Sequence, residues 1–114
     1  MRNSEDMLRL FLESGQQVDE AVAAFGGTYP FGGGYSSLDF PFSRPRALAR
    51  IDGTLEVWTA QRFGGRPVVR IAEAPIEEFT ILREGGRYER VALAGKRFWV
   101  HHRHRAVIEK WATP

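Results

Sequence analysis

The first quarter of the chain carries apolar residues at helical spacing. Asn3 or Ser4 can cap the start of a helix, and Gly26-Gly27 is a typical stop signal. The apolar positions recur roughly once per helical turn: Met7, Leu8, Phe11, Leu12, Val18, Val22 and Phe25. The pattern predicts one amphipathic helix over residues 4–25. Its weak point is Gly15, because an internal glycine costs roughly 1 kcal/mol relative to alanine and can either split a helix or allow close approach to a sheet.

Residues 26–46 combine glycine and proline with aromatic side chains. The glycines and prolines argue against a long helix or a central strand, whereas a simple linker would not be aromatic. The aromatic positions are Tyr29, Phe31, Tyr35, Phe40 and Phe42. We therefore expect a long ordered loop held on the domain by its own aromatic residues. The run 32–34 is not a phosphate-binding loop, because no Gly-Lys-Ser/Thr follows it.

From residue 47 onward, β-like runs alternate with turn dipeptides. Asp-Gly, Gly-Gly and Ala-Gly pairs stand at 52–53, 64–65, 85–86 and 94–95, and such pairs favour two-residue hairpins. The runs are 47–51, 54–63, 66–72, 77–84, 87–93 and 96–103, and 106–111 fits either a strand or a short helix. The chain is thus predicted to be a single α+β domain over residues 1–114. Its N-terminal helix packs on a strongly twisted antiparallel β-meander of about six strands over 47–111, curled like a half-barrel.

Two-residue turns at 85–86 and 94–95 decide which side chains share a face of the meander. They place Ile81 opposite Arg90, Arg83 opposite Tyr88, and Arg90 opposite Trp99, while a one-residue bulge would exchange the two faces. One face is apolar and should be covered by the N-terminal helix: Thr80, Leu82, Val91, Leu93, Phe98 and Val100. The other face interleaves aromatic and basic residues: Glu77, Phe79, Ile81, Arg83, Tyr88, Arg90, Arg97, Trp99, His101 and Arg103.

Composition and charge narrow the class of protein. With 43% hydrophobic residues the 114-residue chain is too apolar to be disordered, and without cysteine it has no disulfide or thiolate chemistry. Residues 1–40 hold two basic and six acidic residues, whereas 41–114 hold 14 basic and 8 acidic ones. The net charge of +2 therefore hides an acidic front and a basic back, with 14 Arg against 2 Lys. Internal charge complementarity, compositional bias and a surface for an anionic partner all fit this distribution.

The mixed Arg/aromatic face is the candidate binding surface. It can be a solvated structural face, or a platform on which bases stack while arginines meet phosphates. We expect a small non-catalytic binding protein whose partner is single-stranded nucleic acid or an acidic protein surface. The partner-binding residues are then Phe79, Arg83, Tyr88, Arg90, Arg97, Trp99, His101 and Arg103.

Three other functions remain open. A metal-independent ribonuclease-like enzyme would use Glu77 as base and His101 as acid, with Arg83 and Arg90 on the phosphate. A curved sheet under a helix also suits a ligand-binding cup. An interaction or inhibitor protein of a mobile element fits a short chain with little site chemistry.

The remaining signals are mostly negative. The three histidines at 101, 102 and 104 make an incomplete metal site, since no cysteine or carboxylate stands near them. We expect no metal and no cofactor. No leader opens the sequence and no apolar run spans a membrane, so we expect a cytoplasmic protein. Unpaired first and last strands are compatible with a monomer or a homodimer.

Overall fold

A computed structural model describes residues 3–27, 43–83 and 86–113, apart from the side chains of 43 and 83. Two α-helices are present, α1 (Ser4–Glu13) and α2 (Arg105–Ala112). Seven strands lie between them: β1 (Glu20–Gly27), β2 (Ser43–Ile51), β3 (Thr54–Ala60), β4 (Pro67–Pro75), β5 (Thr80–Arg83), β6 (Tyr88–Leu93) and β7 (Lys96–His101). Short 3-10 turns, η2 (Ile76–Glu78) and η3 (His102–His104), precede β5 and α2.

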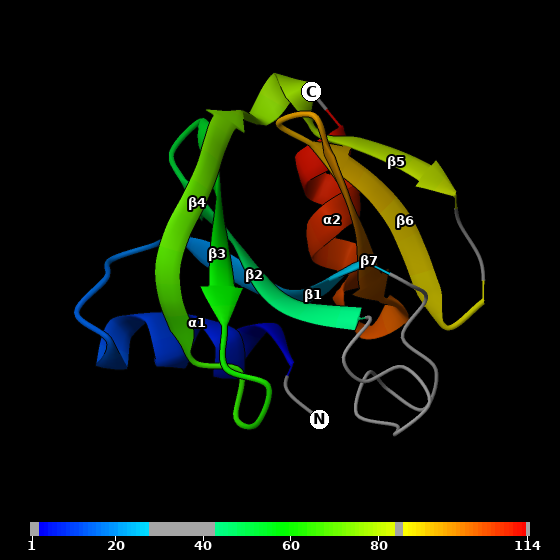
Figure 1. Cartoon of the computed structure of the whole chain (residues 1–114). Coiled ribbons are helices and arrows are strands. Elements are labelled where there is room, and N and C mark those ends of the chain that lie inside the picture. The colour runs from blue at the N-terminus through cyan, green and yellow to red at the C-terminus, as the bar shows by residue number, and fades with distance from the viewer. Residues whose placement is uncertain (1–2, 28–42, 84–85, 114) are drawn as a thin grey trace.

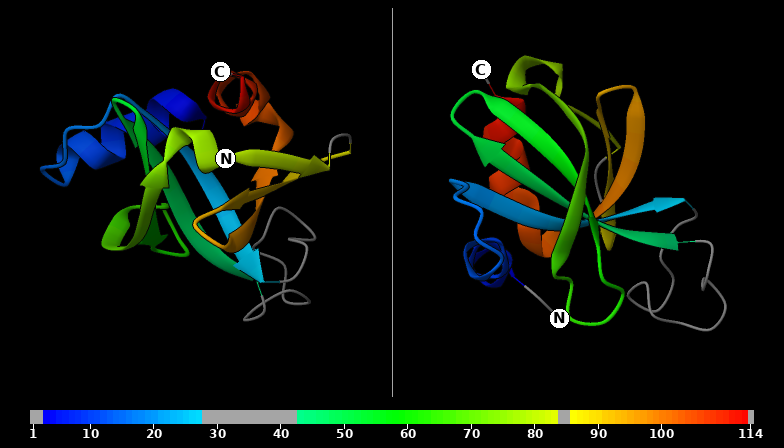
Figure 2. Two further views of the ribbon diagram at one scale, coloured as in Figure 1. Left: turned by 90° about the horizontal axis from the view of Figure 1, so that it is seen from above. Right: turned by 60° about the vertical axis from the view of Figure 1, so that its left-hand side comes forward.

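The strands form one antiparallel sheet in the order β4-β3-β2-β1-β7-β6-β5. The sheet is strongly curved but not closed, so β4 and β5 are its two edges (Figure 1). Helix α2 lies inside the curve, and α1 lies on the outer side of β1 (Figures 1 and 2). The expected α+β class with a half-barrel-like antiparallel sheet is confirmed, with seven strands rather than about six.

The N-terminal helix is shorter than the sequence pattern predicts. An Asn3 capping box starts α1, with reciprocal bonds between Asn3 and Asp6. The chain leaves the helix at Ser14, and Gly15 adopts a φ of 82°, a left-handed conformation that favours glycine. The prediction of a helix over 4–25 is therefore wrong, because α1 ends at Glu13 and the later apolar positions Val22 and Phe25 belong to β1.

Strand β1 explains the misleading periodicity. Its alternate residues face two different hydrophobic layers, as Val22 packs with the α2 side and Ala21 with the α1 side. A strand buried on both faces reads as a continuous apolar run rather than an alternating one. The following loop is also shorter than predicted, because β2 begins at Ser43 and pairs with β1 along its whole length. The aromatic loop residues 29–42 lie outside the described part of the chain.

Two of the predicted turns form tight hairpins. Asp52-Gly53 joins the pair Ile51–Thr54, and Ala94-Gly95 joins Leu93–Lys96. Asp52 and Ala94 have φ values of 51° and 54°, as a primed turn requires at its first central position. The 64–65 pair belongs instead to a longer connection, in which the Gln61 amide donates to the Arg66 carbonyl.

The sheet separates two hydrophobic layers. On the inner side Ile108 and Trp111 of α2 pack against the sheet, and the sheet residues there include Val22, Leu48, Leu55, Val57, Val91, Leu93, Phe98 and Val100. On the outer side Met7, Leu10 and Phe11 of α1 cover an alanine-rich patch of β1 and β2. The prediction that the N-terminal helix covers Val91 and Val100 is therefore wrong, since the C-terminal helix covers them.

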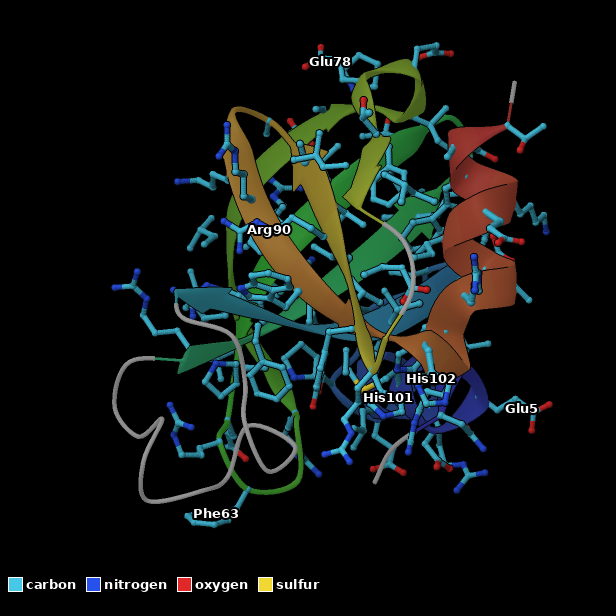
Figure 3. The ribbon with its side chains drawn as sticks, turned by 90° about the vertical axis from the view of Figure 1, so that its right-hand side faces the viewer. Glu5, Phe63, Glu78, Arg90, His101 and His102 are labelled. Atoms are coloured by element: carbon cyan, nitrogen blue, oxygen red, sulfur yellow. The ribbon has the colours of Figure 1, made fainter. Side chains whose placement is uncertain are left out.

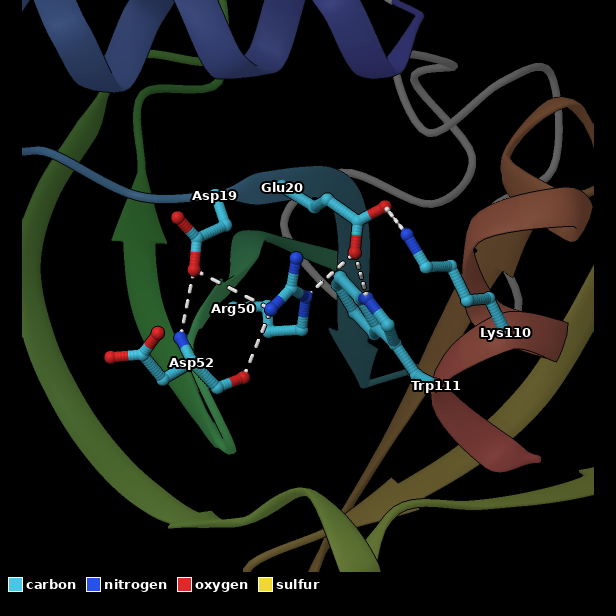
Figure 4. Close-up of polar contacts among 6 residues, drawn as sticks. All are labelled: Asp19, Glu20, Arg50, Asp52, Lys110 and Trp111. Atoms are coloured by element: carbon cyan, nitrogen blue, oxygen red, sulfur yellow. Dashed lines mark hydrogen bonds and ion pairs between the residues drawn. The ribbon is translucent and has the colours of Figure 1, made fainter. Parts of the chain in front are cut away.

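A network of hydrogen bonds and ion pairs around Glu20 joins α2 to the sheet (Figure 4). The Glu20 carboxylate accepts hydrogen bonds from Arg50 Nε (2.7 Å), Trp111 Nε1 (3.0 Å) and Lys110 Nζ (3.1 Å). Burial raises the pKa of Glu20, but the bonds from Arg50, Trp111 and Lys110 outweigh it, so this pKa lies below its ordinary value. Part of the acidic front is thus neutralised by the basic back, as the internal-complementarity interpretation expects.

In the part of the chain that the structure describes, neither helix has the length and apolar character needed to cross a membrane.

Candidate functional site

The β6–β7 hairpin has the predicted register. Arg90 lies opposite Trp99, and Tyr88 lies opposite His101. The Arg90 guanidinium carbon sits 4.3 Å from the centroid of the Trp99 ring, which is a cation–π contact. Figure 3 shows Arg90 on the side of the sheet away from α2. We call the group formed by Arg90, Arg97 and Trp99 the Arg90–Trp99 surface.

The indole of Trp99 is fixed from its other edge. Its Nε1 donates a hydrogen bond of 3.2 Å to the Gly27 carbonyl, and Trp99 pairs with Phe25 across β1 and β7. Because Trp99 lies on β7 and Gly27 ends β1, the indole is attached to two adjacent strands of the sheet. The Arg90 guanidinium is therefore supported by a ring that has a second attachment on the neighbouring strand.

Two predicted contact residues on the same strands are buried. Tyr88 is 2% exposed, and its ring meets His101 edge-on at 5.2 Å and Phe25 at 6.4 Å. His101 is buried as well, with a relative exposure of 9%. The prediction that Tyr88 and His101 contact a partner directly is therefore wrong, because both rings are packed within the protein as supports for the neighbouring surface.

Strand β5 presents the opposite face to that predicted. Ile81 pairs with Val91 instead of Arg90, and a register shift follows it, so that Arg83 lies opposite Arg90. Phe79 is consequently 4% exposed and meets Trp111 edge-on at 5.6 Å in the inner layer, whereas Leu82 points outward. Phe79 is removed from the candidate surface. Arg83 ends β5, and its side chain lies outside the described part of the chain.

Some of the described basic residues form ion pairs with carboxylates and others do not. Carboxylates pair with the basic residues on α1, on α2 and on the β2–β4 half of the sheet: Arg9, Arg50, Arg66, Arg70, Arg105 and Lys110. Within residues 3–27, 43–83 and 86–113, no carboxylate forms an ion pair with Arg90 or Arg97. Burial and then the charge of Arg97 lower the pKa of Arg90 below its ordinary value, although a guanidinium remains charged at neutral pH. The Arg90–Trp99 surface is thus a local excess of positive charge.

The residues proposed for ribonuclease chemistry do not meet. Glu77 lies on η2, beyond the β5 end that pairs with Ala92, whereas His101 lies at the opposite end of the β6–β7 hairpin. Figure 3 shows the same separation, with the adjacent Glu78 and His101 at opposite ends of the molecule. Burial lowers the pKa of His101 to about 4, and the charges of Arg103, His102 and Arg87 add to this, so the ring is neutral at pH 7. A neutral imidazole is a much weaker acid than an imidazolium and is a poor general acid.

Each of the three histidines contacts a different group of the protein. His101 Nδ1 accepts from the Arg103 amide at 3.1 Å, and His104 Nδ1 lies 2.8 Å from Ser4 Oγ. His102 Nδ1 lies 3.3 Å from the Arg87 carbonyl. Among the described residues no group of three His, Asp or Glu side chains is arranged to hold a metal ion. Arg103 remains exposed beside this segment and adds to its positive charge.

Among the described residues, side chains of α2 fill the interior of the half-barrel. Ile108 and Trp111 occupy the space that a ligand-binding cup would leave open, and both are buried. A shallow groove of about 530 Å³ is found instead at the rim, between β5 and the end of α2. This arrangement argues against a ligand held between the helix and the curved sheet.

The site as it stands consists of a half-buried arginine–indole stack, Arg90 on Trp99, and the exposed Arg97 beside it. No model of a protein family matches this sequence, and no curated protein matches it either. Sequence reasoning also missed a second pair of arginines, Arg44 and Arg46, because it assigned them to the loop. They lie on the first part of β2, whose later residues 47–51 were correctly predicted as a β run.

Proposed function

We propose that this protein is a non-catalytic binding protein that takes single-stranded nucleic acid on the Arg90–Trp99 surface. The observation that carries the proposal is the Arg90 guanidinium, which lies 4.3 Å from the centroid of the Trp99 ring and close to Arg97. Among the described residues no carboxylate forms an ion pair with either arginine. Bases in single strands stack on arginine planes and aromatic rings, and their phosphates pair with arginines. One surface thus offers both of the contacts that a single strand needs.

Single strands fit this surface better than a duplex does. The stacking element lies on a strand of the sheet rather than on a helix that could enter a groove. A base face is needed to extend the Trp99–Arg90 stack, and duplex bases present only their edges. An acidic protein would satisfy Arg90 and Arg97 but would leave the stacking face unused, and is therefore the second outcome of the test.

The test is fluorescence anisotropy of a labelled oligothymidylate at several salt concentrations. Arg90→Gln and Arg97→Gln should weaken binding and each reduce the salt slope by about 1. Trp99→Ala should weaken binding by roughly 1–3 kcal/mol with little change in slope, because stacking releases no counterion. The matched control is Arg9→Gln, which removes the same charge from an exposed arginine of α1.

Three results oppose the proposal. Absence of salt-dependent binding would remove nucleic acid as the partner. An equal effect of Arg9→Gln and Arg90→Gln would show that only net charge matters. Equal affinity for an acidic peptide and for the oligothymidylate would favour an acidic protein as the partner.

A further inference from the structure

The groove at the β5 edge lies on the side of the sheet that α2 covers, whereas Arg90 lies on the other side. It is lined by Phe79, Thr80 and Ile81 of the β5 segment and by Glu109, Ala112 and Thr113 at the end of α2. Phe79, which lines the groove, packs edge-on against the buried Trp111. None of the lining residues is basic.

Strand β5 is the last strand of the sheet. Among the described strands only β6 pairs with it, so half of its backbone N–H and C=O groups face outward along the edge. Leu82, which is 49% exposed, adds an apolar side chain to this edge. An outward-facing strand edge beside a groove is the arrangement that accepts an extended peptide as an additional strand.

The opposite edge of the sheet is poorly suited to the same role. Strand β4 has two register shifts against β3, between Val57 and Trp58 and between Trp58 and Ala60. Such bulges, together with the charged Arg70 and Glu73 on the strand, disfavour the addition of another strand. The β5 edge has one shift, after Ile81, at the end remote from Phe79.

The surroundings of the groove are acidic. Glu77 and Glu78 are exposed on η2, directly before Phe79, and Glu109 stands on the groove wall. The C-terminal end of α2 also lies here, and the unsatisfied carbonyls of a helix end attract cations. Glu109 forms an ion pair with Arg105, whose Nε lies 2.8 Å from its carboxylate. The whole chain has a net charge of +2, whereas this rim of the groove carries negative charge.

We propose that the β5 edge and its groove bind an extended peptide segment rich in Lys or Arg by strand addition. The backbone of the segment pairs with β5, and its basic side chains meet Glu77, Glu78 and Glu109. This site goes beyond the proposed nucleic-acid surface and does not depend on it. Occupation of both would let one molecule bridge a nucleic acid and a basic partner segment.

The experiment uses the full chain and a short acetylated, amidated peptide in which Lys and Val alternate. Binding is followed by amide chemical shifts, with shifts expected at Thr80–Leu82 and at the end of α2. The double variant Glu77→Lys/Glu78→Lys should weaken binding about tenfold, which is about 1.4 kcal/mol. The exposed control Glu5→Lys, on α1, should leave it unchanged. A peptide with proline at the central position should not bind, because proline lacks the N–H that strand pairing needs.

Each opposite result overturns the proposal. Equal binding of a Glu/Val peptide would exclude the acidic rim as the determinant. Shifts confined to residues outside the β5–α2 groove would exclude the site. Concentration-dependent dimerisation that shifts the β5 amides would assign the edge to a second copy of this chain. None of these results bears on oligothymidylate binding, which is measured separately at Arg90 and Trp99.

Discussion

Acidification from pH 7 to pH 5 should destabilise this protein through a buried histidine. His104 is 1% exposed, and its Nδ1 lies 2.8 Å from Ser4 Oγ at the start of α1. Burial lowers its pKa to about 4, and the positive charges of Arg103 and His101 contribute further. The folded protein therefore keeps this imidazole neutral at a pH where the unfolded chain already protonates it.

The sign and size of the effect follow from the two pKa values. Above the ordinary value of 6.5 the ring is neutral in both states and costs nothing. Between 6.5 and 4 only the unfolded chain takes up the proton, so stability falls by about 1.4 kcal/mol per pH unit. At pH 5 the expected loss is about 2 kcal/mol from His104 alone. His101, whose pKa is also lowered to about 4, acts in the same direction.

The assay is urea denaturation at pH 7 and pH 5. The pKa of Glu20 is lowered, so its carboxylate remains charged between pH 7 and pH 5. The hydrogen bonds and ion pairs of Glu20 therefore do not contribute to the loss of stability over this range. His104→Gln should be less stable than the native chain at pH 7 but should lose less stability on acidification. The control Lys96→Gln, an exposed residue at the opposite end of β7 from His101, keeps all three histidines and should show the native pH dependence. If His104→Gln and the native chain lost equal stability between pH 7 and pH 5, the reasoning would be refuted.

Three further predictions concern the turns and the ion network. Gly15→Ala should lower the free energy of unfolding by about 1 kcal/mol in urea titrations, because φ is 82° there; a gain in stability would indicate a continuous helix instead. Ala94→Gly should raise the melting temperature, with up to about 1 kcal/mol from relief of its positive φ of 54°; no change would show an unstrained turn. Glu20→Gln should cost about 2 kcal/mol in chemical denaturation, since it removes the charged partner of Arg50 and Lys110; a neutral effect would mean that α2 is held by apolar contacts alone.

The local turns were the most predictable part of the fold. Asp52-Gly53 and Ala94-Gly95 form tight hairpins because their backbone conformations are dictated by neighbouring residues. Strand β1 was not predictable in the same way, because its side chains are buried on both faces and read as a helical stripe. Its identity as a strand depends on pairing with β2 and β7, which local sequence does not encode.

The candidate site was predictable as far as the register was. The β6–β7 turn correctly brought Arg90 to Trp99, whereas one register shift after Ile81 reversed the face of β5. Burial of Tyr88 and His101 depends on tertiary packing and has no signal in alternation alone. The two-residue alternation of side chains along a strand therefore identifies which residues share a face, but not which face is exposed to solvent.

The sheet order also determines how this chain must assemble. Strands β1 to β4 are neighbours in sequence, and so are β5 to β7, so each half can form through local hairpins. Pairing of β1 with β7 joins the halves across most of the chain, at Phe25 and Trp99. Long-range pairing is slow because loop-closure entropy opposes it. The Arg90–Trp99 contact lies within the local β6–β7 hairpin, whereas the hydrogen bond from Trp99 to Gly27 crosses the long-range pairing, so the second support of the indole should form later than the first.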